Sequence, residues 1–230
     1  MFGWLRRPPS TSPTEQQLQL MKALVGYPPY APPEYRPDPN AESMRAASAQ
    51  YREYFLASRQ ARLEGLREFL ANFDVSLGLD DAGLMAVSTW LPYWANLLVS
   101  EFKDRDAYKR LEVPWTGRLR GLNVVFDLGI YYAECLWARR TKLEWLVFRG
   151  ADMHGNVLAT HAIKGLPGGK SFDPFDFMFW ECWDIRKAKI AKQKRMPYSD
   201  DPWHLRSESF YRHVLAKAPP VRRSRKSGRR

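Results

Sequence analysis

The stretch "FDLGIYYAECLWARR" (126–140) places two carboxylates, Asp127 and Glu134, in an otherwise apolar and aromatic run. Paired carboxylates act as general acid and base in glycoside cleavage when they lie about 5 to 9.5 Å apart. Seven residues along one helix correspond to roughly 10.5 Å at 1.5 Å per residue. The spacing favours a structural role, because a buried carboxylate is usually held by a backbone amide, an Arg or a Trp N–H.

The element that positions this pair is a predicted helix over residues 119–139. It is apolar on two sides, which is typical of a central, buried helix. Asn123, Asp127 and Glu134 form a narrow polar stripe along it. Gly129 and Ala133, four residues apart, permit the close approach of another element.

Other catalytic and cofactor signals are weak. The segment "KGLPGGKS" (164–171) resembles a phosphate-binding loop, but a lysine stands where the motif needs its first glycine. His154, His161, Cys135 and Cys182 lack the close spacing of metal ligands. We therefore expect no catalytic set, no cofactor and no metal.

Helical and extended patterns alternate along the chain. Helices are predicted over 14–25, over 40–72 with Asn40 as N-cap, from Asp80 or Asp81 until Pro92 ends or kinks it, from Asp173, and from Asp201. Strands are predicted over 142–149 and 156–163. Residues 103–118 are expected to form a loop with short turns. The arginines of the 40–72 helix, Arg52, Arg59, Arg62 and Arg67, are expected to be mostly solvated.

This pattern predicts an α+β fold, with a helical body and a β-hairpin or small antiparallel sheet. We expect three parts. Residues 1–39 form an N-terminal arm with a proline-rich linker, residues 40–216 a single α+β domain, and residues 217–230 a disordered basic tail.

The net charge of +11 is localised. The segments 186–195 and 221–230 hold twelve of the 36 Lys and Arg, so 24 basic residues remain against 25 acidic ones. Such charge can attract nucleic acid or an anionic surface. The candidate anion contacts are Arg186, Lys187, Lys189, Lys192, Lys194, Arg195, Arg222, Arg223, Arg225, Lys226, Arg229 and Arg230.

Composition restricts the setting. Two cysteines give no disulfide framework, which fits a reducing compartment, and no transmembrane segment is recognisable. We therefore expect a cytoplasmic protein.

The aromatic run 172–184 predicts a helix with one broad apolar face. Phe177 and Trp180 fall on its other side. They are expected either to form an exposed interaction patch or to be covered by a terminal segment. Beyond Ile185, Arg186 and Lys189 fall on the apolar side, so the helix is expected to leave the body there.

At "DLGIYYAECLWARRTKLEW" (127–145) the chain resembles a class of small, uncharacterised bacterial proteins. In these, an Asp-x-Gly-x-Tyr-x-x-Glu-like helix precedes a Trp-containing strand. The resemblance covers roughly residues 80–185 and has Gly129 and Glu134 as its signature positions. It implies an α+β domain without an established activity, and some such domains act as immunity or adaptor proteins.

Three functions follow as hypotheses. The first is a non-enzymatic intracellular protein, adaptor-like or immunity-like, whose partner is another protein. The second is a nucleic-acid-associated protein that uses segments 186–195 and 222–230. The third and least favoured is a hydrolase-type enzyme that uses Asp127 and Glu134.

Overall fold

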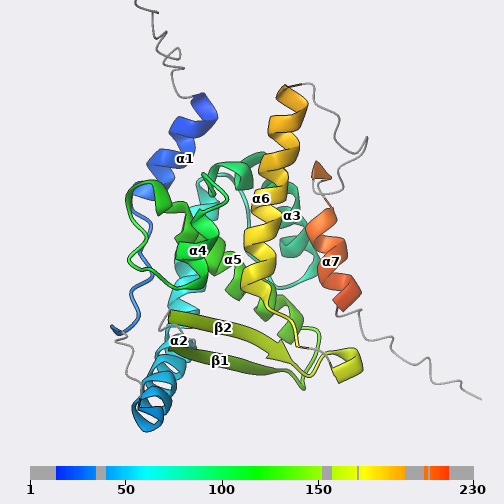
Figure 1. The fold of residues 1–230 in the computed structure, drawn as a ribbon. Coiled ribbons are helices and arrows are strands. Elements are labelled where there is room, and N and C mark those ends of the chain that lie inside the picture. The colour runs from blue at the N-terminus through cyan, green and yellow to red at the C-terminus, as the bar shows by residue number, and fades with distance from the viewer. Residues whose placement is uncertain are drawn as a thin grey trace, which may run out of the picture.

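The computed structural model describes residues 14–34, 40–151, 157–169, 171–194, 205–206 and 208–217. Within them, the chain forms seven α-helices and a two-stranded antiparallel sheet, which confirms the predicted α+β class (Figure 1). The helices are α1 Glu15–Val25, α2 Ala41–Ala71, α3 Asp81–Trp94, α4 Asp104–Lys109, α5 Gly121–Trp137, α6 Pro174–Gln193 and α7 Ser209–Lys217. The strands are β1 Glu144–Ala151 and β2 Val157–Lys164, and short 3-10 helices are η1 Ala95–Leu97, η2 Gly117–Leu119 and η3 Pro167–Gly169.

Local sequence signals set the helix starts. Thr14 and Gln17 form a reciprocal capping box at the start of α1. The side chains of Asn40, Asp80 and Asp173 each accept a main-chain N–H bond at the starts of α2, α3 and α6. Each bond satisfies a donor that the first helical turn leaves unpaired.

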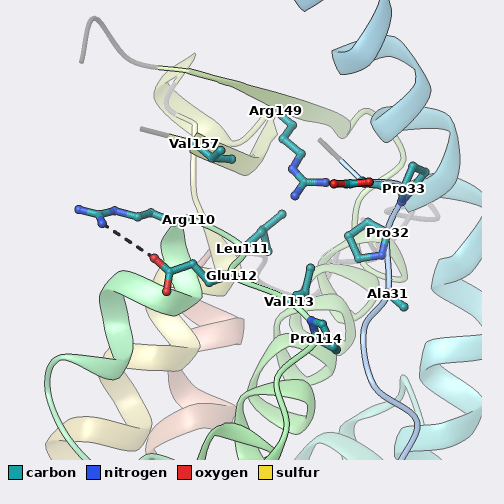
Figure 2. Close-up of a pocket in the computed structure, with 11 residues that line it drawn as sticks. Ala31, Pro32, Pro33, Arg110, Leu111, Glu112, Val113, Pro114, Arg149 and Val157 are labelled. Atoms are coloured by element: carbon teal, nitrogen blue, oxygen red, sulfur yellow. Dashed lines mark hydrogen bonds and ion pairs between the residues drawn. The ribbon is translucent and has the colours of Figure 1, made fainter. Parts of the chain in front are cut away.

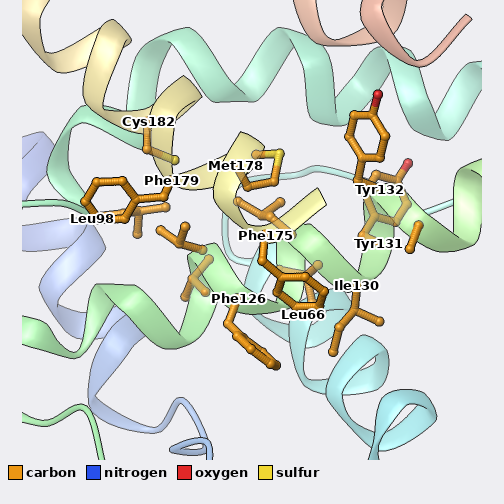
Figure 3. Packing of buried hydrophobic residues seen from close by; sticks show 14 of the residues in the cluster. Leu66, Leu98, Phe126, Ile130, Tyr131, Tyr132, Phe175, Met178, Phe179 and Cys182 are labelled. Atoms are coloured by element: carbon orange, nitrogen blue, oxygen red, sulfur yellow. The ribbon is translucent and has the colours of Figure 1, made fainter. Parts of the chain in front are cut away.

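Helix α5 is the centre of the core. Every residue from Gly121 to Ala133 is buried, because α2, α6 and α7 all pack against it. Figure 3 shows Phe126 of α5 beside Phe175 of α6. Despite this apolar character, none of the described helices is both long enough and apolar enough to cross a membrane.

The hairpin lies against α2 through β1. Its register pairs Glu144 with Lys164 at one end and Ala151 with Val157 at the other. Trp145 and Val147 are buried on the inner face. The predicted hairpin connection falls mostly on residues 152–156, which lie outside the described residues.

The segment 27–34, here called the arm segment, runs along the core. Tyr27 and Tyr30 are buried in the same hydrophobic cluster as the residues of α2 and α5. The predicted boundary between residues 39 and 40 therefore separates two stretches that share one core.

Three local expectations differ from the structure. Of the two outcomes expected at Pro92, an end or a kink of the helix, the end is not observed, because α3 continues to Trp94. Residues 103–118 contain α4, in addition to turns and the start of η2. Helix α6 does not leave the body after Ile185, because Ala188 and Ala191 are also buried. The side chains of Arg186 and Lys189 instead reach main-chain carbonyls of α3 and η1.

A substitution at Gly129 tests the close packing of α5 on α6. A Cβ atom at this position would lie 2.8 Å from the Phe175 ring and 3.2 Å from its Cα. We expect Gly129→Val to lower the free energy of unfolding by about 1–3 kcal/mol, as overpacked cores do. Gly26→Ala is the control, since nothing lies within 4 Å of its Cβ. Urea denaturation that gives equal stability for the two variants would contradict this packing.

Candidate functional site

Asp127 lies in the middle of α5 with no solvent-exposed surface. Arg62 of α2 binds it as a fork, with Nε 2.8 Å from Oδ1 and Nη2 2.6 Å from Oδ2. The Tyr27 hydroxyl donates to Oδ2, and Arg62 Nη1 donates to the Pro28 carbonyl at 2.8 Å. One carboxylate thus joins α5, α2 and the arm segment. With both oxygens bound and no open surface, it cannot contact a substrate.

The charge state of Asp127 follows from its surroundings. Burial raises its pKa to about 6, while the guanidinium of Arg62 acts in the opposite direction. At neutral pH the carboxylate is therefore ionised and is neutralised by Arg62. A buried pair of this kind is costly to break from one side only, because the remaining charge has no partner.

The other two residues of the polar stripe also have partners. Asn123 Oδ1 accepts the Tyr30 N–H at 2.7 Å, and its Nδ2 donates to the Trp115 carbonyl at 2.9 Å. Glu134 lies 2.7 Å from Arg59 of α2, and its side chain is 22% exposed. The stripe therefore connects α5 to the arm segment, to the loop before α5 and to α2.

A chain of aromatic polar groups continues from the arm segment into the sheet. The Tyr30 and Tyr51 hydroxyls are 3.0 Å apart, and the Tyr51 hydroxyl bonds to His161 Nε2 on β2. Arg149 of β1 lies over the Tyr51 ring at 5.3 Å and donates to the Pro33 carbonyl at 2.9 Å. Burial, with a smaller effect of Arg149, lowers the pKa of His161 to about 3. The imidazole is therefore neutral at physiological pH.

A pocket of about 540 Å³ lies between the arm segment, residues 110–114 and the ends of the hairpin strands (Figure 2). Prolines of the arm segment form one wall. Arg110 and Glu112 are 3.9 Å apart on the other, and Arg149 projects between the walls. The lining carries both signs of charge and does not select an obvious ligand class.

A smaller pocket, about 220 Å³, reaches the ring of His161 beside Tyr108, Lys109 and Asp173. Asp173 caps α6 with one of its oxygens. Throughout the described ranges, no group of three His, Cys, Asp or Glu side chains is placed to hold a metal ion.

The two cysteines are buried in α5 and α6. Burial raises the pKa of Cys135 to about 12 and raises that of Cys182 further above the range of a free thiol. Both side chains are therefore protonated thiols at neutral pH, which is the unreactive form.

The aromatic pair Phe177 and Trp180 makes intramolecular contacts. Phe177 stacks on His213 of α7, with centroids 4.1 Å apart and planes 12° apart. Trp180 packs against Phe102 at 5.6 Å and lies beneath Arg105 at 4.8 Å. A C-terminal helix, α7, therefore covers Phe177, as one of the two expected alternatives has it. Trp180 is covered by residues 102 and 105, which do not belong to a terminal segment.

The predicted anion contacts fall into three groups. Arg186 and Lys189 donate to main-chain carbonyls, and Lys187 pairs with an aspartate one turn earlier. Lys192 and Lys194 are exposed. The others lie outside the described residues, namely Arg195, Arg222, Arg223, Arg225, Lys226, Arg229 and Arg230.

The solvent face of the hairpin carries an exposed apolar group that the sequence reasoning did not identify. Leu146, Phe148 and Leu158 are 46%, 46% and 44% exposed. They are here called the hairpin patch. The available signal was β1 itself, because Leu146 and Phe148 alternate with the equally apolar Trp145 and Val147. When a strand carries apolar side chains on both faces, either one face is exposed to solvent or both faces are covered by other elements.

Arg62 is the second site residue that the sequence reasoning did not identify. It is expected from the sequence to be mostly solvated, but it is only 6% exposed. Its position carries the signal. Arg62 follows Phe55 by seven residues and precedes Leu66 by four, so all three share one helix face. A charged residue within a buried stripe requires a buried partner.

No protein-family model, curated protein or solved structure matches the chain. The resemblance to small bacterial α+β proteins therefore stays a prediction.

Removal of Arg62 tests the buried pair. Arg62→Met leaves the Asp127 carboxylate without its counter-charge, so we expect a loss of about 3–5 kcal/mol in the free energy of unfolding. Tryptophan fluorescence during urea unfolding measures it. Arg59→Met is the matched control, because its pair with Glu134 is partly solvated and should cost at most about 1 kcal/mol. Equal losses for the two variants would contradict the role given to Arg62. Arg62→Met combined with Asp127→Leu should recover much of the loss.

A pH series tests the neutral state of His161. The folded-state pKa of His161 is lowered to about 3, so between that value and about 6.5 only the unfolded chain binds its proton. This contribution to stability is therefore lost as pH falls through that window. We expect the stability difference between wild type and His161→Gln to shrink by about 1 kcal/mol from pH 6 to pH 5. Groups that titrate in both proteins cancel in this difference. A gap that is constant with pH would show that folded His161 takes up its proton as readily as the unfolded chain.

Proposed function

We propose that the chain is a non-enzymatic binding protein whose partner is another protein, and that the partner docks on the hairpin patch. The observation that carries this proposal is the exposure of Leu146, Phe148 and Leu158 on one face of the sheet. Contiguous exposed apolar side chains on a folded surface are typical of interaction sites.

The composition of this face supports the proposal. Residues on the solvent face of an antiparallel sheet are usually polar. On this sheet the three large side chains of the solvent face are apolar. The Phe148 ring lies over Gly150, where a Cβ atom would come within 2.3 Å of it. The ring thus packs against the main chain of its own strand.

A polar margin borders the hairpin patch. Glu144 and Lys164, paired across the strands, form an ion pair at 3.0 Å, and both side chains are more than half exposed. An apolar centre with a solvated polar edge is the usual anatomy of a protein interface.

The use made of the reactive side chains supports a function without catalysis. The carboxylate oxygens of Asp127 accept hydrogen bonds from Arg62 and Tyr27. The thiols of Cys135 and Cys182 are buried and protonated. The two free cysteines also fit the reducing environment of the cytoplasm, where we place the protein.

Substitution of the hairpin patch tests this function. We expect Leu146→Ser with Leu158→Ser to reduce recovery of the partner at least roughly tenfold, because two apolar side chains no longer bury. Quantitative affinity capture from the source cells compares this variant with wild type and with Leu79→Ser. Leu79 is 40% exposed and lies outside the patch. The same partners at the same recovery with all three proteins would exclude the hairpin patch as the docking site.

A further inference from the structure

Helix α1 is apolar on two sides, and within the described ranges only one of these sides is packed against other residues. Leu20 and Leu24 face the core. Leu18, Met21 and Val25 are 45%, 58% and 71% exposed. At 100° per residue these three lie within about 60° of one another, so they form a single stripe along the outer side of the helix. We call it the α1 stripe.

Helix α1 lies at the same end of the molecule as the C-terminal end of α6 (Figure 1). The Tyr93 carbonyl of α3 accepts hydrogen bonds from both Gln16 of α1 and Lys189 of α6, at 2.7 and 2.8 Å. The same end of the molecule therefore holds α1 and the C-terminal turns of α6 (Figure 1). The Tyr93 side chain is 60% exposed.

Three exposed lysines lie at this end of the molecule. Lys22 lies next to Leu18 on the helical wheel of α1, and Lys192 and Lys194 are exposed at the end of α6. In the described part of the chain none of these three lysines has a carboxylate within ion-pair distance. Helix α1 itself carries one acidic residue, Glu15, and one lysine, Lys22.

We propose that this end of the molecule docks on an anionic membrane surface, with the α1 stripe in the lipid headgroup region and the lysines on the acidic headgroups. Charge complementarity selects this occupant. An amphipathic helix with apolar residues on one side and lysines beside them is the arrangement that lies in a membrane interface. Each lysine near an anionic surface contributes about 1 kcal/mol, and this attraction is screened by salt.

The sequence before α1 has the same character. Phe2, Trp4 and Leu5 are followed by Arg6 and Arg7. Aromatic residues with arginines are the types enriched at membrane interfaces. This surface is separate in sequence and composition from the hairpin patch, so the two proposals stand or fall independently.

Flotation of the full chain with vesicles tests the inference. Phosphatidylcholine vesicles with 30 mol% phosphatidylserine, about the composition of an acidic leaflet, are compared with pure phosphatidylcholine at low and high salt. We expect binding to the acidic vesicles only, and weaker binding at high salt. Leu18→Gln with Met21→Gln should lower the partition coefficient roughly tenfold or more, because the apolar contribution is lost.

Matched controls separate α1 from other parts of the chain. Leu146→Gln with Leu158→Gln removes similar apolar surface from the hairpin patch and should leave vesicle binding unchanged. Lys192→Glu with Lys194→Glu should weaken it, whereas Lys103→Glu, elsewhere on the surface, should not. Thermal melts followed by circular dichroism verify that each variant is folded.

Two results would overturn the proposal. One is vesicle binding that the Leu18 and Met21 substitutions leave unchanged, which would assign it to the basic segments alone. The other is no binding to acidic vesicles at low salt. In that case, a protein captured by wild type and lost with the α1 variant would assign the stripe to a protein partner. If the hairpin variants no longer capture a protein partner but still bind vesicles, the result supports the proposed function and leaves the membrane proposal unchanged.

Discussion

The ion pair between Arg62 and Asp127 is the constraint on which the rest of the core depends. A charge in the middle of the most buried helix is tolerated only with a partner that satisfies both of its oxygens. Arg62 provides that partner from α2, and its remaining N–H group fixes the arm segment through Pro28. The relative positions of α2, α5 and the arm segment are therefore coupled through one carboxylate.

The polar interior and the apolar exterior complement each other. The residues that suggested chemistry from their type, Asp127, His161 and Cys135, are buried and serve the packing of the core. The residues open to partners are leucines, a phenylalanine and lysines on the hairpin, α1 and the end of α6. The two proposed docking faces lie on different elements and differ in chemistry, one being the apolar hairpin patch and the other an apolar stripe with lysines.

The sequence was sufficient for the parts of the fold that local signals determine. The caps at Asn40 and Asp173, the hairpin strands, and the close approach at Gly129 were all predicted, because each depends on a few neighbouring residues. The partners of Asp127 were not predicted, because Tyr27 and Arg62 lie 100 and 65 residues away along the chain. The contacts of Arg186 and Lys189 were missed for the same reason. A helical wheel shows which face carries a lysine, but not which carbonyl lies opposite.

The path of the arm segment has a consequence for the order of assembly. Tyr27 precedes its partner Asp127 by 100 residues, and Tyr30 precedes Asn123 by 93. At a synthesis rate of about 5–20 residues per second, the arm segment waits some seconds before its binding site on α5 exists. It can contact α2 before α5 is made, through Tyr30 and Tyr51, but its bonds to Asp127 and Asn123 can form only afterwards. Contacts of this range favour slow folding.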